Sequence, residues 1–267
     1  NLDDTQKRKR RRALMEWSDE AIVLSVRTHG ETSSILEALT REHGRHMGLV
    51  YGGVSGKRRA VLQPGNSIHV KWRARIAEHL GSYTAEPVRL RAGEIFETRA
   101  SLIGLNAFVA IAGAVLPERE PHGSAFEGAN FLLETISAQG FEKWGLVFAR
   151  WELLLLDDLG FGLDLSSCAG TGSTENLVYV SPRSGRAVSG EAGEAYHNKL
   201  LSLPGFLIDD SIEAPSSEDI GAALALTAYF LNLWVLAPHE RRLPEARRRL
   251  NDFAAKHAMS LQGRESD

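Results

Sequence analysis

The hydrophobic period of the chain changes once, near Gly93, and this change divides the 267 residues into two parts. Before it, short segments alternate apolar and polar side chains, which is the period of a β-strand with one buried face. After it, apolar residues recur every three or four positions, which is the period of a helix. We therefore expect an α+β protein of two domains, an all-β part followed by an all-α part.

The all-β part contains five candidate strands with glycine or proline turns between them. We place the strands at residues 21–27, 32–41, 45–51, 67–75 and 80–86. Between the third and fourth strands, residues 56–63 are long enough for about two helical turns and end at Pro64. Three strands, a short helix and two strands is the order of an OB-fold, a five-stranded barrel that commonly binds oligonucleotides. The sequence thus predicts an OB-fold nucleic-acid-binding domain over residues 15–93.

Charge is distributed unevenly along the chain. Residues 1–14 carry a net charge of +4, residues 15–93 carry +3, and residues 94–267 carry −10. Residues 44–91 hold nine basic side chains against only Glu78 and Glu86. A basic first part on an acidic second part is typical of a protein that binds phosphate backbones while staying near neutral overall.

The fourth predicted strand gives the clearest local pattern. His69, Lys71, Arg73 and Arg75 fall on one face, because side chains on a strand change face at every step. Solvated faces usually mix charges of both signs, and this face has no carboxylate before Glu78 in the sequence. The pattern favours binding to phosphates with little sequence specificity.

Aromatic side chains on exposed surfaces often stack on the bases of single strands. Trp72 falls on the apolar face of the fourth strand, so we expect it in the core. Tyr51 and Tyr83 stay open as stacking platforms.

The first 14 residues have no periodicity and contain the basic run of residues 7–12. The run could be a nucleic-acid arm, but we interpret residues 1–14 as a flexible basic leader of no assigned role, which need not be native.

The all-α part, residues 94–267, has helical patterns at residues 97–116, 124–138, 142–159 and 220–237, and a last helix near Pro244. The uncharged stretch 220–237 reaches the lower limit for a membrane span, but a buried central helix explains it better, so we expect no membrane contact.

Residues 161–193 form an irregular insert with one strand-like piece at 177–180. Five arginines form a second basic cluster, which is either a solvated helix face or a docking site for an acidic partner: Arg241, Arg242, Arg247, Arg248 and Arg249.

Sequence motifs for catalysis are weak. Residues 52–57 lack the first glycine and the hydroxyl residue of a phosphate loop. The pairs Asp157-Asp158 and Asp209-Asp210 are more typical of solvated caps than of a magnesium site. A single cysteine, Cys168, excludes an internal disulfide and favours a reducing, cytoplasmic setting. We expect no enzyme and no cofactor; an RNA- or ribosome-associated OB-fold protein and a DNA-processing enzyme stay open as alternatives.

The order of these parts resembles the RecO family of bacterial recombination mediators over residues 15–258. The segments that carry the resemblance are residues 20–24, residues 52–65, and residues 159–161 before Leu165-Ser166-Ser167-Cys168. In zinc-bearing members the insert supplies two cysteine pairs. Here only Cys168 is kept, with Thr171 at the position of its partner and the second pair replaced near Val188 and Glu191. The resemblance therefore implies that the insert occupies the place of a zinc ribbon but no longer binds zinc.

The resemblance implies a non-enzymatic repair factor that binds single- and double-stranded DNA and anneals complementary strands. It also implies that the factor helps RecR to load RecA on DNA coated by single-stranded DNA-binding protein (SSB), whose acidic tail binds in the helical domain. We expect the five arginines of the second basic cluster to bind the acidic tail of SSB. The residues expected to contact DNA are Arg27, Arg45, Lys57, Arg58, Arg59, Lys71, Arg73 and Arg75.

Overall fold

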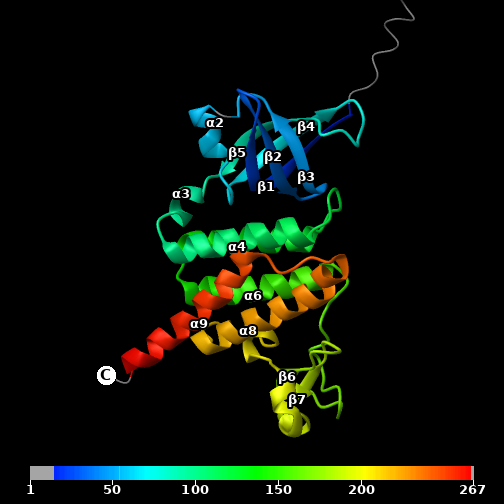
Figure 1. The fold of residues 1–267 in the computed structure, drawn as a ribbon, viewed down its shortest axis with the longest axis vertical. Coiled ribbons are helices and arrows are strands. Elements are labelled where there is room, and N and C mark those ends of the chain that lie inside the picture. The colour runs from blue at the N-terminus through cyan, green and yellow to red at the C-terminus, as the bar shows by residue number, and fades with distance from the viewer. Residues whose placement is uncertain (1–14, 54, 266–267) are drawn as a thin grey trace, which may run out of the picture. The chain divides into compact units, whose positions relative to one another are not determined.

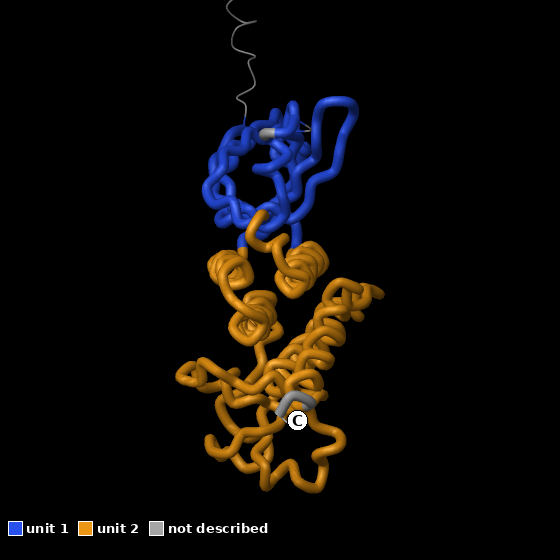
Figure 2. Tube along the Cα trace, turned by 90° about the vertical axis from the view of Figure 1, so that its left-hand side faces the viewer, with its two compact units in different colours: residues 1–92, 117–121 blue, residues 93–116, 122–267 orange. Residues whose placement is uncertain are grey.

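The computed structural model describes residues 15–53 and 55–265, except for the side chains of Lys57 and residues 263–265. The predicted leader, residues 1–14, lies outside the described residues. The chain forms two compact units (Figure 2). The first unit comprises the chain up to Ala92 and the segment Pro117–Pro121, and the second comprises Gly93–Leu116 and the chain from His122 onward.

The first unit is a closed five-stranded barrel with the strand order β1-β2-β3-β5-β4 (Figure 1). Its strands are β1 (Met15–His29), β2 (Ser33–Thr40), β3 (Gly44–Val50), β4 (Ser67–Ala74) and β5 (Ser82–Arg89). Helix α2 (Gly56–Val61) lies between β3 and β4 in the sequence. All neighbours are antiparallel except β3 and β5, which pair in parallel at Leu49 and Ser82 alone. The predicted five-stranded fold is confirmed.

Strand β1 begins six residues before the predicted start at Ala21. Its first half, from Met15 to Ile22, pairs with β4. Its second half, from Ala21 to His29, pairs with β2, and the register shifts between Val23 and Ser25. One long, bent strand therefore serves two neighbours and closes the barrel.

The interior of the barrel is mainly apolar, and it also holds a buried polar pair, His46 and Tyr83. Trp72 is 1% exposed, as predicted, and its indole N–H donates to the Leu80 carbonyl at 3.0 Å. Tyr83 is 3% exposed and its hydroxyl lies 2.8 Å from Nδ1 of His46. The proposal of Tyr83 as a stacking platform is therefore wrong, because its ring is in the core. Burial also lowers the pKa of His46 to about 4, so this imidazole is neutral at pH 7.

The segment Pro117–Pro121 adds to the edge of β3. The Arg119 N–H donates to the Arg45 carbonyl at 2.9 Å, and the Arg119 guanidinium donates to the carbonyl of Ala77 at 2.7 Å. Gly44 has φ +66°, and a Cβ at this position would lie 2.0 Å from the Glu120 carbonyl oxygen. Only glycine permits this close approach of two backbones.

The second unit is built on helices α4 (Arg99–Val115), α5 (Gly123–Ala138), α6 (Phe141–Asp158), α8 (Ser217–Phe230) and α9 (Glu245–Glu265). The helix α6 buries Trp144, Phe148 and Trp151 on one face. Helix α8 continues as a π-helical turn, Leu231–Leu236, and a 3-10 turn, Ala237–His239. Shorter helical pieces are α3 (Ala92–Ile95), α7 (Gly190–Gly193), Glu194–Lys199 and Gly205–Leu207.

The apolar segment Ser217–His239 is long enough to cross a membrane by length and composition alone. Within it, α8 buries Ile220, Leu224 and Phe230 in the second unit. Its apolar side chains are therefore used for packing against other helices.

The insert is more regular than the sequence indicates. Its strands β6 (Leu177–Val180) and β7 (Ala187–Ser189) form a three-stranded sheet of order β7-β6-β8 with β8 (Leu201–Ser202), which follows the insert in the chain. Only β6 is predicted, because strands of two or three residues are too short to show a period.

Arg247 lies in the core of the second unit and is 0% exposed. Its guanidinium donates to both carboxylate oxygens of Glu152, at 2.6 and 2.7 Å, and to the Leu224 carbonyl at 2.8 Å. The Thr227 hydroxyl donates to the same carboxylate at 2.5 Å. The expectation that Arg247 binds a partner is therefore wrong, because its charge is matched inside the protein.

Replacing Glu152 by alanine leaves the buried Arg247 charge without its partner, so we expect the free energy of unfolding to fall by about 3–5 kcal/mol. Urea denaturation followed by circular dichroism measures this change. Glu245→Ala is the control: it removes the exposed ion pairs to Arg248 and Arg249 and is expected to change stability by less than about 1 kcal/mol. Equal effects of the two substitutions would contradict this account of the core.

Candidate nucleic-acid interface

The outer face of β4 is basic in sequence, but its charge is partly offset in the fold. Lys71 and Arg73 both form ion pairs with the carboxylate of Glu16. Their hydrogen bonds hold the pKa of Glu16 below its usual value, so the carboxylate stays charged at neutral pH. The prediction of a face without a carboxylate before Glu78 is wrong, because β1 starts at Met15 and places Glu16 opposite Arg73.

Arg45 is also engaged within the barrel unit. It pairs with Glu37 at 2.5 Å and with Glu118 at 3.7 Å, and its side chain is 16% exposed. Arg75 follows the end of β4 and is exposed. Four of the predicted DNA contacts have now been placed: Arg45, Lys71, Arg73 and Arg75. Among them, only the Arg75 guanidinium pairs with no carboxylate in the described residues.

The cations around α2 have a different environment. Arg58 and Arg59 are exposed on α2, and Arg27 is exposed on β1. The Arg58 guanidinium donates to the Tyr51 carbonyl. Within residues 15–53 and 55–265, no carboxylate forms an ion pair with these three arginines. The side chain of Lys57, also predicted to bind DNA, is outside the described part of the chain.

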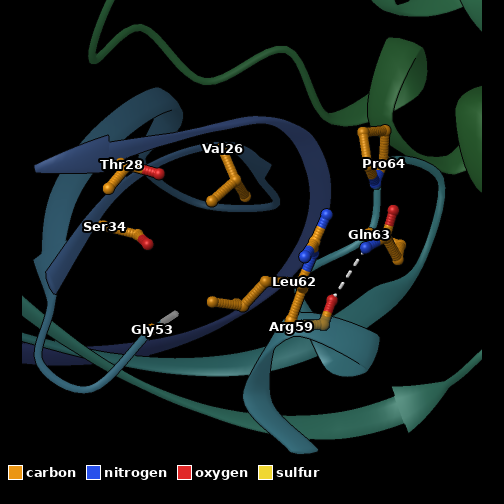
Figure 3. Close-up of a pocket in the computed structure, with 8 residues that line it drawn as sticks. All are labelled: Val26, Thr28, Ser34, Gly53, Arg59, Leu62, Gln63 and Pro64. Atoms are coloured by element: carbon orange, nitrogen blue, oxygen red, sulfur yellow. Dashed lines mark hydrogen bonds between the residues drawn. The ribbon is translucent and has the colours of Figure 1, made fainter. Parts of the chain in front are cut away.

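A pocket of about 380 Å³ opens at the end of the barrel beside α2 (Figure 3). Its polar lining comes from Thr28, Ser34, Arg59 and Gln63. Val26 and Thr28, the two neighbours of Arg27 in β1, lie across the pocket from α2. The sequence gives no signal for this pocket, since hydroxyl residues at strand ends have no distinctive spacing.

A smaller pocket of about 160 Å³ is lined by Tyr51, Arg58 and Tyr83, among other residues of the same region. Tyr51 is 63% exposed, so its ring is accessible at this pocket. The prediction of Tyr51 as a stacking platform thus stays open, unlike that of Tyr83.

In the second unit, the predicted arginine cluster is divided. Arg241 and Arg242 are exposed, and Arg248 and Arg249 pair with Glu245 at 3.6 and 2.6 Å on the surface of α9. Only Arg247 is buried.

Arg249 also lines a cleft of about 520 Å³ formed by α4 and α9. Arg99 and Lys256 give the cleft further positive charge, and Ile103 and Phe253 give it an apolar floor. Asp252 and His257 complete the lining, and His257 lies 2.7 Å from the Glu142 carboxylate. Arg99 and Lys256 are not predicted from the sequence, because they lie in different helices far apart in the chain.

Cys168 lies in the insert beside hydroxyl side chains. The Ser189 N–H donates to its sulfur at 3.3 Å, and hydrogen bonds from Ser189 and Thr171 lower the pKa of the thiol to about 6. A lone sulfur with hydroxyl neighbours does not match the cysteine and histidine ligands of structural zinc sites. The residues at this position therefore do not fit a zinc ion.

Comparison with known proteins identifies the family. Residues 15–91 match the family model of the recombination protein O N terminus, and residues 97–242 match that of its C terminus. The chain belongs to the RecO family. It is 47% identical to the DNA repair protein RecO of Rhodospirillum centenum over 240 residues, which are 89% of this chain and 94% of that protein.

A second relative, the DNA repair protein RecO of Sinorhizobium medicae, is 48% identical over 224 residues, 84% of this chain and 88% of the relative. The resemblance inferred from the sequence is confirmed. Membership of the RecO family supports a general role in DNA repair and recombination.

Replacing Glu16 by glutamine releases Lys71 and Arg73 from their shared carboxylate. We expect Glu16→Gln to bind a single-stranded oligonucleotide several-fold more tightly at low salt and with a steeper salt dependence, because two more cations are available to phosphates. Fluorescence anisotropy over a range of salt concentrations measures both quantities.

Glu42→Gln is the matched control for this substitution. It changes the net charge by the same amount, but the Glu42 carboxylate makes no ion pair within the described residues. An equal effect of the two substitutions would show that overall charge, and not release of the β4 cations, determines the affinity.

Proposed function

We propose that this chain is a non-enzymatic mediator of DNA repair and recombination that acts in the cytoplasm. In this proposal it binds single- and double-stranded DNA mainly through phosphates and anneals complementary strands. With RecR it helps to load RecA on DNA coated by SSB. The observation that carries the proposal is the set of exposed arginines near α2, which have no paired carboxylate among the described residues, in a chain of the RecO family.

The physical basis of annealing is charge neutralisation. Two complementary strands repel each other through their phosphates, and bound cations lower this repulsion. Arg27, Arg58 and Arg59 can contact phosphates without breaking an internal ion pair. Base pairing between the strands then supplies the sequence specificity that the protein surface lacks.

In each carboxylate pair considered for catalysis, one member has a structural role. Asp158 accepts from the Ser124 hydroxyl at 2.7 Å and from the Ala125 N–H at 2.8 Å, which caps the start of α5. Asp209 accepts from the hydroxyl and the N–H of Ser211, at 2.7 and 2.9 Å. These contacts favour a binding protein over a magnesium-dependent nuclease.

We propose that the α4–α9 cleft holds the acidic, apolar tail of SSB. Arg99, Arg249 and Lys256 suit the carboxylates of such a peptide, and Ile103 and Phe253 suit its apolar side chains. This assignment keeps Arg249 from the sequence-based cluster and adds two cations from elsewhere in the chain.

The test of DNA binding compares two double variants of equal charge. Arg58→Ala/Arg59→Ala is expected to weaken binding to single-stranded DNA and to reduce the slope of log K against log salt by about 1.4, or about 0.7 for each lost phosphate contact. Lys71→Ala/Arg73→Ala is expected to change the slope less, because both cations already pair with the Glu16 carboxylate. Anisotropy titrations at several salt concentrations measure the slopes, and an unchanged slope in the first variant would contradict the proposal.

The test of the cleft uses a synthetic peptide of the SSB tail and isothermal titration calorimetry. Arg249→Ala/Lys256→Ala is expected to weaken binding about tenfold or more, since each charged contact contributes about 1 kcal/mol or more. Arg241→Ala/Arg242→Ala removes two exposed cations outside the cleft and is expected to leave the affinity unchanged. Equal affinities of the wild type and the cleft variant would exclude this site.

A further inference from the structure

The pocket at the end of the barrel is enclosed by several segments. Its lining comes from β1 and β2, from Gly53 after β3, from α2, and from the turn at Pro64 (Figure 3). The pocket is partly open to solvent, so a phosphate group can enter it from outside.

Ser34 is the most informative residue in this pocket. It is 2% exposed, and its hydroxyl accepts or donates no hydrogen bond to any other described residue. Buried hydroxyl groups nearly always have a partner, since an unpaired one costs free energy. Among the described residues, the fully buried side-chain atoms without a partner are His122 Nε2 and Trp144 Nε1, so the Ser34 hydroxyl oxygen is reached from the pocket and can hydrogen-bond to a group that enters it.

The other polar groups of the pocket suit an anion. The Arg59 side chain extends from α2 alongside Leu62, with its guanidinium at the far end (Figure 3). Thr28 adds a second hydroxyl from β1, and the described lining contains no carboxylate. Gln63 is held by a hydrogen bond from its amide to the Arg59 carbonyl at 2.9 Å. A guanidinium with two hydroxyl donors is a suitable set for a phosphate group.

Gly53 keeps space open beside Ser34. A Cβ at residue 53 would lie 2.8 Å from the Ser34 hydroxyl oxygen and 2.9 Å from its Cβ. Any larger residue here would therefore occupy the space in front of the unpaired hydroxyl.

We propose that this pocket binds the terminal phosphate of a nucleotide, either at the end of a DNA strand or on a free nucleoside monophosphate. The inference rests on the proposed DNA-binding function and adds to it recognition of a strand end. A terminal phosphate carries more negative charge and one more free oxygen than an internal phosphodiester, which suits a pocket that offers one guanidinium and two hydroxyls. Val26, Leu62 and Pro64 supply an apolar wall for the attached sugar or base.

The test compares two oligonucleotides of about ten nucleotides, within the range that one OB-fold covers. They have the same sequence and differ only in a 5′-phosphate or a 5′-hydroxyl. The wild-type protein is expected to bind the phosphorylated strand about tenfold more tightly, the effect of hydrogen bonds to a charged group. Calorimetry with deoxyadenosine monophosphate and with deoxyadenosine tests the free nucleotide, and only the monophosphate is expected to bind.

Two variants locate the effect. Ser34→Ala removes the unpaired hydroxyl, and Gly53→Ala fills the space beside it. Both are expected to abolish most of the preference for the phosphorylated strand. Because the Ser34 hydroxyl has no partner among the described residues, Ser34→Ala is also expected to keep the wild-type melting temperature. Arg27→Ala is the control: it changes an exposed cation outside the pocket and is expected to weaken both oligonucleotides equally.

The outcomes separate the two proposals. Equal binding of the two oligonucleotides by the wild type, or a preference that persists in both pocket variants, would overturn the pocket assignment while leaving the DNA-binding function in place. Binding of the monophosphate without binding of any oligonucleotide would support the pocket and contradict the proposed function. Binding of none of these ligands would contradict both.

Discussion

The antiparallel pairing of β1 with β4 closes the barrel, and it also determines which cations of the barrel can meet a phosphate. Residues directly opposite each other on one sheet face are close enough for their side chains to interact. Glu16 in β1 lies opposite Arg73 and pairs with both Arg73 and Lys71, so one carboxylate offsets part of the charge of the most basic strand in the sequence. Further along, β1 pairs with β2 and contributes Val26 and Thr28 to the pocket of Arg59. Strand β1 thus pairs with cations of β4 through Glu16 and lines the pocket of Arg59 through Val26 and Thr28.

The fold of the barrel could be predicted because its signals are local. Alternation and turn residues indicate each strand, and the short helix between β3 and β4 indicates the OB-fold. The start of β1 was missed because Asp19 points inward where an apolar residue is expected. This side chain is 6% exposed and lies 2.9 Å from Nδ1 of His43, a partner 24 positions away. The error in β1 then hid the pairing of Glu16, and with it the true charge of the β4 face.

In the helical domain too, the sequence alone does not predict which arginines of a basic cluster are exposed. Arg247, Leu250 and Ala254 are spaced by three and four residues, so they share one face of α9, and all three are buried. That spacing was available in the sequence, but the partner that makes burial of the charge possible, Glu152, lies in α6. The α4–α9 cleft likewise depends on Arg99 and Lys256 from distant parts of the chain. Contacts between distant residues, rather than local patterns, decide which arginines are available.

The central claim is that DNA contacts the barrel through arginines that have no paired carboxylate, and not through the cations on β4. Nuclear magnetic resonance of the arginine side-chain N–H groups in the full chain, titrated with a single-stranded oligonucleotide, tests it most directly. The account predicts that the signals of Arg27, Arg58 and Arg59 shift with added DNA while that of Arg73 does not. A shift confined to Arg73, with the other three unchanged, would contradict it.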